Sequence, residues 1–143
     1  MTRDEITALF DRRTEYWHRH NAAALTADHS EDCVVISPTG GVLEGHDAIE
    51  RIYRVWFSAF PDLTISPTEL LIDGDRVMLV FVLRGTHAGD FFGLPASGRH
   101  LEATCAFLYK MANGRIVQER RILDFTGVLV QVGVLRAKPA AGA

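Results

Sequence analysis

The chain has very few cysteines, and their spacing does not suggest a covalent framework. The two that it contains, Cys33 and Cys105, are far apart in the 143 residues and fall in apolar segments that we predict to be strands. A small disulfide-stabilised domain would need more cysteines at short spacings. We therefore expect two free, buried thiols that pack as small apolar side chains.

The sequence also lacks a long hydrophobic run and any excess of positive charge. No segment approaches the roughly 20 apolar residues that cross a membrane, and the N-terminal MTRDEITALFDRR has no apolar core of the signal-peptide kind. The formal net charge is -3, so no basic stripe is available to neutralise phosphates. These absences predict a cytoplasmic protein that binds neither membrane nor nucleic acid.

Motifs for the common cofactors and for covalent catalysis are missing as well. The sequence has no glycine-rich phosphate loop, no GxSxG elbow and no Cys–His spacing typical of a nucleophile. Its histidines share no ligand spacing with a carboxylate or a thiol, so we predict no metal site. The chemistry that remains open is non-covalent proton transfer without a cofactor.

What the chain does contain is the composition of an ordinary globular domain. Hydrophobic residues make up 48% and charged residues 23%, with no shift in the middle that would mark two domains. We expect a single domain over residues 1–135. The remaining residues 136–143, RAKPAAGA, carry few bulky apolar side chains and are expected to form a flexible tail.

The first part of the chain has the apolar spacing of helices. Thr2 and Glu5 have the spacing of a capping box, and the helical pattern behind them continues to about His20. A short second helix is predicted over 22–29. A third helix, with an unusually aromatic apolar face, ends before Pro61, because proline cannot continue a helix.

Residues 63–125 are rich in predicted strands. Asn113-Gly114 is a strong hairpin signal, because a tight type I′ turn needs positive φ at both positions. Pro67 indicates an edge strand, and a long loop is expected over 88–98. Helices followed by long antiparallel strands predict an α+β cone, in which a curved, mostly antiparallel sheet wraps over about three N-terminal helices and leaves a hollow.

The hairpin also predicts which side chains share a face of the sheet. If its turn holds two residues, counting outward sets Asp124 opposite Ala103 and Arg120 opposite Phe107. This count turns Asp124 and Arg120 towards the apolar interior, where a carboxylate needs a partner or a solvated pocket. A β-bulge in either strand would reverse the assignment.

Three polar residues are candidates for chemistry, and each has a structural alternative. Asp124 could transfer protons in the hollow or could simply cap a helix over 125–132. His87 could orient a substrate carbonyl and share a proton with Asp124, or could be an ordinary residue at a strand end. Arg120 could hold the far end of a ligand, or its stem could pack on the sheet with its head in solvent.

Several motifs together resemble one protein family. They are the segments 85–99 (GTHAGDFFGLPASGR), 113–120 (NGRIVQER) and 128–135 (VLVQVGVL), together with Asp124. They resemble the SnoaL-like polyketide (ester) cyclases of the NTF2-like superfamily, to which ketosteroid isomerases and limonene epoxide hydrolases also belong. The resemblance implies the α+β cone and an intramolecular aldol ring closure of a polyketide-like substrate, without metal or organic cofactor.

The resemblance also implies roles for individual residues. Asp124 matches the family's aspartate, which removes a proton next to a carbonyl and returns it to the new alkoxide. His87 matches a polar group of the pocket, and Arg120 stands where the family often has tryptophan. The expected substrate is a small hydrophobic, polycyclic or polyketide-like compound. The candidate substrate-binding residues are Arg120, Trp56, Phe60, Phe91, Phe107 and Tyr16, although an aromatic helix face such as that of Trp56 and Phe60 is also typical of a core helix.

Other functions on the same fold remain open at this stage. One is a ketosteroid-isomerase-like isomerase or an epoxide hydrolase; the latter should have a second pocket carboxylate. Another is a non-catalytic module that binds a small ligand, since fold does not determine function. The strand predicted over 76–83 is apolar on both faces, which favours a homo-oligomer, either a dimer or a tetramer.

Overall fold

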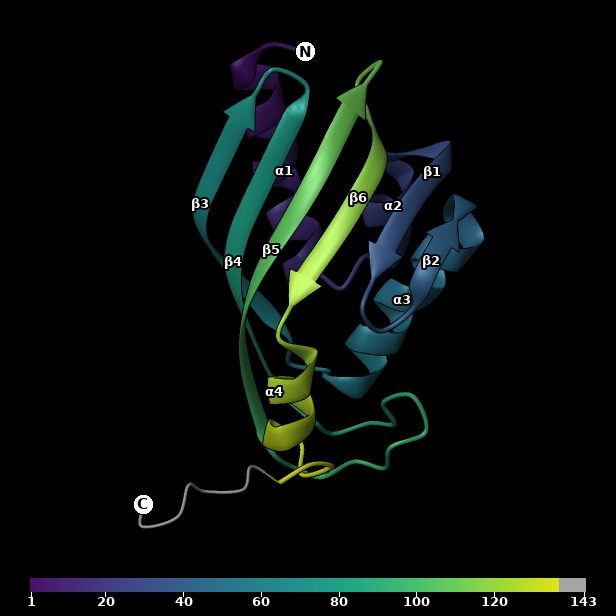
Figure 1. The fold of residues 1–143 in the computed structure, drawn as a ribbon, viewed down its shortest axis with the longest axis vertical. Coiled ribbons are helices and arrows are strands. Elements are labelled where there is room, and N and C mark those ends of the chain that lie inside the picture. Colours follow the sequence, from purple (N-terminus) through teal and green to yellow (C-terminus); the bar gives the residue numbers. More distant parts are fainter. Residues whose placement is uncertain (137–143) are drawn as a thin grey trace.

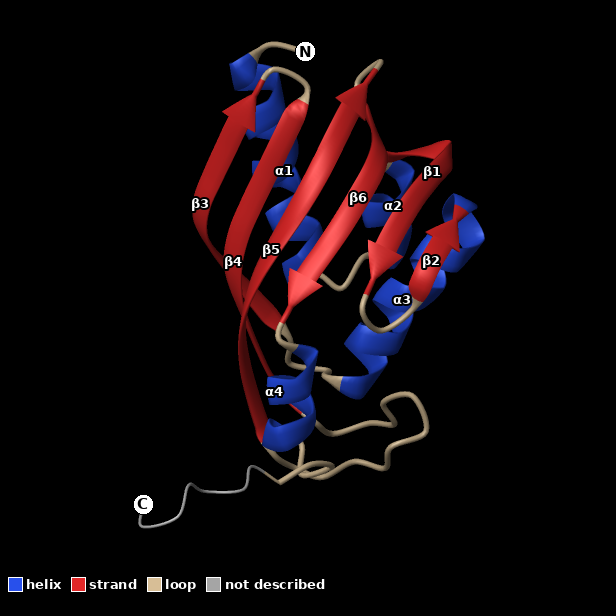
Figure 2. Cartoon of the chain, in the orientation of Figure 1, coloured by secondary structure: helices blue, strands red, loops and turns tan. Residues whose placement is uncertain are grey.

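The computed structural model describes residues 1–136, which form helices on one side of a curved sheet (Figures 1 and 2). In chain order the elements are α1 (Arg3–His18), α2 (Ala22–Ala27), β1 (His29–Ser37), β2 (Gly41–Glu44), α3 (Gly45–Ala59), β3 (Thr64–Asp73), β4 (Arg76–Thr86), β5 (His100–Ala112), β6 (Arg115–Leu123) and α4 (Phe125–Gln131).

The sheet has six strands in the order β2-β1-β6-β5-β4-β3. Strands β1 and β6 run parallel, and all other neighbours run antiparallel. Helices α1, α2 and α3 cover one face of the sheet, and α4 lies beyond the end of β6 (Figure 1). This arrangement confirms the predicted α+β cone.

The N-terminal helices begin as the sequence predicts. The Thr2 hydroxyl accepts a hydrogen bond from the Glu5 amide at 3.2 Å, and the Thr2 amide donates to the Glu5 carboxylate at 2.7 Å, which completes the capping box. Helix α2 ends at Ala27, slightly earlier than expected, because His29 already pairs with Ile116 of β6.

The core lies between the helices and the inner face of the sheet. Strand β4 alternates fully buried and partly buried residues along most of its length, as expected of a strand with one face on the core. The buried apolar side chains of α3 and of β5 belong to this core; they are Ile49, Ile52, Tyr53, Trp56, Phe57, Ala59, Leu101, Ala103, Cys105, Phe107, Tyr109 and Met111.

The predicted hairpin turn is confirmed. Asn113 and Gly114 have φ of 52° and 74°, which are the positive values that a two-residue turn of this kind needs. Ala112 faces Arg115 across the turn. Pro67 likewise lies in an edge strand, β3, where its missing N–H is tolerated.

The register beyond this turn differs from the prediction, because β6 contains a β-bulge. Met111 pairs with Ile116, but Lys110 pairs with Gln118, which leaves Val117 as an extra residue. One extra residue reverses which side chains of the following strand face the interior. Beyond Val117 the predicted inward face of β6 is therefore its outward face, whereas Ile116, before the bulge, is buried as predicted.

The bulge changes which arginine points into the core. Phe107 pairs with Arg121 rather than Arg120, and Tyr109 pairs with Glu119. Glu119 and Arg121 are buried, whereas Arg120 is exposed on the outer face of the sheet. The prediction that Arg120 and Asp124 share an inward face with Phe107 is wrong for this reason.

Other predictions concern the cysteines and the ends of the chain. Cys33 and Cys105 are free and buried, and burial raises the pKa of each thiol to about 12. Apart from Arg136, the predicted tail 136–143 lies outside the described residues. Within residues 1–136 no helix is both long and apolar enough to span a membrane.

Candidate functional site

A narrow cavity lies inside the cone, and its lining includes the last residues of β1 and β6, Ser37 and Leu123. It has a volume of about 20 Å³, which is room for about one water molecule. Its lining is mainly aromatic and aliphatic, with one charged side chain. The lining residues are Trp17, Ser37, Thr39, Tyr53, Trp56, Leu83, Ala103, Cys105, Phe107, Arg121 and Leu123.

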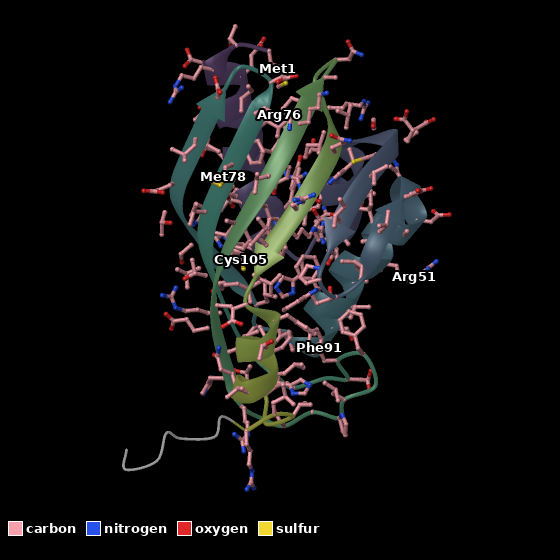
Figure 3. All side chains as sticks on the ribbon, in the orientation of Figure 1. Met1, Arg51, Arg76, Met78, Phe91 and Cys105 are labelled. Atoms are coloured by element: carbon pink, nitrogen blue, oxygen red, sulfur yellow. The ribbon has the colours of Figure 1, made fainter. Side chains whose placement is uncertain are left out.

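Two of the predicted aromatic wall residues, Trp56 and Phe107, line this cavity. Phe60 and Phe91 lie behind Trp56, with ring centroids 5.6 Å and 4.9 Å from it. Phe91, labelled in Figure 3, belongs to the loop between β4 and β5 and is fully buried. Tyr16 is partly buried against the core and does not line the cavity.

The charged residue of the lining, Arg121, forms a buried ion pair with Glu119. The Nε and Nη2 atoms of Arg121 donate to Glu119 Oε2 at 3.2 Å and 3.0 Å. The guanidinium also lies over the rings of Tyr53 and Phe107, 4.6 Å and 5.4 Å from their centroids. Charge pairing and cation–π contacts together stabilise a cation inside the core.

His29 also contacts this ion pair. Its Nε2 lies 3.3 Å from Glu119 Oε2, and its Nδ1 lies 3.1 Å from the Leu25 carbonyl. Both neighbours are acceptors, but the Leu25 carbonyl already accepts from Arg13 at 2.8 Å. A neutral His29 with its proton on Nε2 donates to the charged acceptor, Glu119, and leaves Nδ1 beside the Leu25 carbonyl without a hydrogen bond. Complete burial lowers the pKa of His29 and favours this neutral form, although the hydrogen bond to Glu119 opposes the shift.

Arg13 of α1 holds the other side of the cluster. This residue is 2% exposed, and its Nη1 donates to Asp28 at 3.1 Å while its Nη2 donates to the Tyr53 hydroxyl at 3.0 Å. The Tyr53 ring that covers Arg121 is therefore itself fixed in place by a second arginine. We call Arg13, His29, Tyr53, Glu119 and Arg121 the buried polar cluster.

The charges of the cluster are set by burial and by pairing. Burial alone would raise the pKa of Glu119, but the charge of Arg121 and the hydrogen bond from His29 outweigh burial and lower it. Burial alone would lower the pKa of Arg121, and the Glu119 carboxylate raises it instead. Burial raises the pKa of Tyr53. Glu119 and Arg121 are thus ionised at neutral pH, while Tyr53 is neutral.

Sequence reasoning missed the whole buried polar cluster. One signal was present: Arg13 falls on the apolar stripe of the first helix, between Phe10 and Trp17, and a charge at such a position needs a buried partner. The inward direction of Glu119 and Arg121 depends on the bulge, which the sequence does not mark.

Asp124 has the position that the helix-cap interpretation predicts. It is exposed and is the N-cap of α4, and its Oδ1 accepts from the Gly127 amide at 2.9 Å. Its Oδ2 accepts no hydrogen bond from any of residues 1–136. Asp124 does not line the interior cavity, but the preceding residue, Leu123, does.

His87 is buried at the start of the loop between β4 and β5. Its Nδ1 lies 2.8 Å from Ser97 Oγ and accepts from the Ser97 amide at 3.3 Å. A ring nitrogen that accepts from an amide carries no proton, so the proton of neutral His87 is on Nε2. That Nε2 is buried without a hydrogen-bond partner among the described residues. The nearest ring lies 5.6 Å away, between the centroids of His87 and Phe60.

Arg120, which the sequence places in the pocket, borders a different hollow. An open groove of about 690 Å³ runs over the outer face of the sheet. Arg120 lines it together with Ile36, Leu71, Met78 and Leu108; Met78 on this face is labelled in Figure 3. The groove is wider than the interior cavity and Glu119 is among its lining residues, but it is open to solvent and Arg121 does not line it. We therefore take the interior cavity as the candidate site.

The described residues contain no group of three or more His, Cys, Asp and Glu side chains arranged to hold a metal ion. The charged side chains near the cavity instead form ion pairs with one another. The cavity as it stands has room for about one water molecule and offers aromatic walls and one fixed cation, Arg121.

Solved structures with the same fold include bacterial proteins of several descriptions. AclR from Streptomyces galilaeus, described as a candidate hydroxylase, has a TM-score of 0.84 and 23% identity over 96% of this chain and 87% of its own. IdmH from Streptomyces antibioticus, a candidate polyketide cyclase, has a TM-score of 0.72 and 27% identity over 92% and 97%. A protein from Catenulispora acidiphila with a ketosteroid isomerase-like fold has a TM-score of 0.75 and 18% identity over 97% and 100%.

No curated protein sequence matches the chain significantly. The family model of the SnoaL-like polyketide cyclases matches residues 7–132. This match covers most of α1 and all of α2, α3, the sheet and α4. The chain therefore belongs to the SnoaL-like polyketide cyclase family.

Proposed function

We propose that the protein closes a ring in a polyketide-like carbonyl compound by an intramolecular aldol-type reaction that needs only acid–base catalysis. The observation that carries this proposal is the interior cavity of a SnoaL-like chain, walled by Trp56 and Phe107 and bordered by the ionised Arg121. An apolar site with a few fixed polar groups is the usual form of a small-molecule pocket.

The reaction needs three things from the protein. A base removes a proton from the carbon next to a carbonyl, and the enolate carbon then attacks a second carbonyl of the same molecule. The new alkoxide takes up the proton that the base removed, so no other reactant is consumed. The aromatic walls hold the flat substrate in a folded, reactive conformation, and hydrogen-bond donors stabilise the enolate.

Asp124 is the base in this proposal. Its Oδ1 caps α4 through Gly127, while Oδ2 is left for proton transfer. Because Leu123 lines the cavity and Asp124 follows it directly, a substrate that reaches out of the cavity past Leu123 comes within range of this carboxylate.

His87 serves as a polar group of the pocket. Its Nε2 is buried without a partner, and an N–H in that condition gains a hydrogen bond when a substrate carbonyl reaches it. The rings of Phe60 and Phe91 separate it from Trp56. Since the cavity is only about 20 Å³, binding a polyketide-sized substrate requires these aromatic side chains to move apart.

The test uses Asp124→Asn on the full chain. Asparagine keeps the shape of the side chain and its ability to cap a helix, but it cannot accept the proton. We expect ring closure of a panel of aromatic β-dicarbonyl esters, followed by chromatography, to fall by about 100-fold or more. Near wild-type turnover by a folded Asp124→Asn variant would refute Asp124 as the base.

The same assay separates the alternatives. Exchange of the carbon-bound proton for deuterium without ring closure would favour an isomerase of the ketosteroid type. Binding without any exchange or product would favour a ligand-binding module. An epoxide hydrolase needs a second carboxylate beside a bound water, whereas the buried Glu119 is held by Arg121 and is not part of the cavity lining.

We also propose that a second copy of the chain covers the outer face of the sheet. Four large apolar residues there are far more exposed than is usual for their type: Ile36 at 42%, Leu71 at 51%, Leu108 at 40% and Ile122 at 49%. They lie on β1, β3, β5 and β6 of the one sheet, and Met78 of β4 joins Leu71 to Leu108, so they form one surface rather than scattered positions. Surfaces of this kind are typical of protein interfaces.

A further inference from the structure

The guanidinium of Arg121 has one edge that the protein itself does not use. Its Nε and Nη2 atoms are bound to Glu119 Oε2, and its faces lie against the rings of Tyr53 and Phe107. Nη1 makes no hydrogen bond to any of residues 1–136. Because Arg121 lines the interior cavity, Nη1 is the edge left for a ligand.

The surroundings fix this edge before any ligand arrives. Glu119 is held by His29 as well as by Arg121, and the Tyr53 ring is held through its hydroxyl by Arg13. A donor that is already oriented loses little freedom on binding. Arg121 is therefore a pre-organised hydrogen-bond donor, held in place by the other residues of the buried polar cluster.

The charge of this donor favours one kind of ligand atom. Arg13 is paired with Asp28 and Arg121 with Glu119, so the cluster is balanced without a ligand. A purely apolar ligand would leave the Nη1 protons unbonded in a site of low polarity, which is costly. A negatively charged oxygen conjugated to a flat ring would satisfy them, and the ring would contact the aromatic walls once those side chains have moved apart to admit it.

We propose that Arg121 is the oxyanion-binding residue of the interior cavity, and that the substrate presents the oxygen of a conjugated enolate to its Nη1 edge. This inference rests on the proposed function, because an enolate is the species that the proposed proton transfer creates. It narrows the substrate to an enolisable carbonyl compound that is more acidic than a simple ketone. It also assigns to Arg121 the contact that the sequence alone suggested for Arg120.

The test compares two small rings of the same size. 1,3-Cyclohexanedione is an enolate at neutral pH, whereas cyclohexanone is neutral. Binding is measured by the indole signals and fluorescence of Trp17 and Trp56, the two tryptophans of the chain, both of which line the cavity. We expect the wild-type protein to prefer the enolate by about tenfold or more, the size of one charged hydrogen bond. Benzoate, an equally flat carboxylate, tests whether any conjugated anion binds as well; tighter binding of benzoate than of the enolate would overturn the enolate assignment.

Three variants decide which residue gives the preference. Arg121→Gln should abolish it, and the double variant Glu119→Gln with Arg121→Gln should do the same without leaving an unpaired buried charge. Arg120→Gln, one position along and on the opposite face, should retain it. Loss in Arg120→Gln, or retention in the folded double variant, would overturn the proposal.

A further measurement does not depend on any variant folding. In the wild-type protein, the side-chain N–H signals of Arg121 should shift when 1,3-cyclohexanedione is added and should stay in place with cyclohexanone. No shift despite enolate binding would overturn the proposal. Selective binding without proton exchange or ring closure would leave Arg121 as an oxyanion site and would remove the proposed reaction.

Discussion

The pair formed by Glu119 and Arg121 is the residue-scale feature on which both the stability and the chemistry of the interior depend. Burying two charges is favourable only when each is closely paired and hydrogen-bonded. Here Glu119 Oε2 accepts from both Arg121 and His29. The arrangement therefore keeps a cation beside the cavity that neither a lone arginine nor a neutral side chain could supply.

Removing one partner of this pair should be far more harmful than removing both. We expect Glu119→Gln to lower the free energy of unfolding by about 3–5 kcal/mol, because it leaves the Arg121 charge unpaired in the core. Replacing both residues by apolar side chains of similar size, Glu119→Leu with Arg121→Met, should recover most of that loss. Urea denaturation of the three proteins measures this, and equal losses in the single and double variants would contradict it.

His29 should make stability depend on pH. Its pKa is lowered from 6.5 by burial, so the unfolded chain binds a proton that the folded protein does not. The contribution of neutral His29 to the free energy of unfolding is therefore complete above pH 6.5. It decreases as the pH falls towards the lowered pKa of His29, by up to about 1.4 kcal/mol per pH unit.

Urea denaturation between pH 6.5 and pH 5 separates this effect from that of Glu119, because Glu119 makes stability depend on pH only below its ordinary pKa of 4.5. Below pH 4.5 stability again decreases as the pH falls, because a carboxylate with a lowered pKa stabilises the folded protein when ionised and loses that contribution as it is protonated. His29→Gln should flatten the slope between pH 6.5 and pH 5, while replacing the exposed His100 by Gln serves as the control. An unchanged slope in His29→Gln would show that this histidine is not buried in its neutral form.

Asp124 should contribute to stability as a helix cap, whatever its part in the reaction. Asp124→Ala removes the acceptor for the Gly127 amide and should destabilise the protein by about 1 kcal/mol. Asp124→Asn should change stability by much less. Thermal unfolding of the two variants measures the role of Asp124 as a helix cap, and their turnover measures its role as a base. Equal stability of both variants would mean that the cap contributes nothing measurable.

At the scale of elements, the bulge at Val117 determines what the interior contains. The turn at Asn113-Gly114 was predictable, because its residue types need little tertiary support. The extra residue in β6 was not, since a bulge leaves no reliable mark in a run such as RIVQERRIL. A shift of one position turns Arg121 instead of Arg120 towards the interior. The hairpin turn was therefore predicted correctly, but the arginine predicted to face inward was the wrong one.

The loop between β4 and β5 is the other element that shapes the cavity. The amides of Ala88 and Gly89 both donate to the Ala59 carbonyl at the end of α3, and a side chain added at Gly89 would overlap the Ser58 carbonyl. The loop can lie this close to α3, with Phe91 against Trp56, only because residue 89 has no Cβ.

Gly89→Ala should therefore lift the loop from α3. We expect a loss of about 1–3 kcal/mol in the free energy of unfolding, the usual range for overpacking, and a change in the environment of Trp56. Ala88→Gly, at the neighbouring position, is the control for a simple change of loop flexibility. Wild-type stability and wild-type tryptophan signals in Gly89→Ala would contradict this account of the loop.

At the scale of the whole molecule, most of the fold could be predicted. Helical spacing, the capping box of Thr2 and Glu5 and the edge proline Pro67 each depend on short stretches of sequence, and together they lead to the observed cone. The buried polar cluster could not be predicted, because it joins α1, β1, α3 and β6 through contacts between residues far apart in the chain.

The outer face of the sheet gives a prediction about assembly. If a second copy covers it, Leu108→Glu should convert the protein from a homo-oligomer to a monomer, because a charge would be buried in an apolar interface. The fold should persist, since Leu108 points away from the core and is 40% exposed. Sedimentation equilibrium measures both proteins; a monomeric wild type would contradict the proposal.

Ring closure in the interior cavity is best tested by an NMR titration of the labelled protein with aromatic β-dicarbonyl esters, with product followed by chromatography. We expect shifts in the indole signals of Trp17 and Trp56 and a ring-closed product; in Asp124→Asn the product should be lost while the shifts remain. Shifts confined to the outer-face groove around Arg120, or undiminished product in Asp124→Asn, would contradict it.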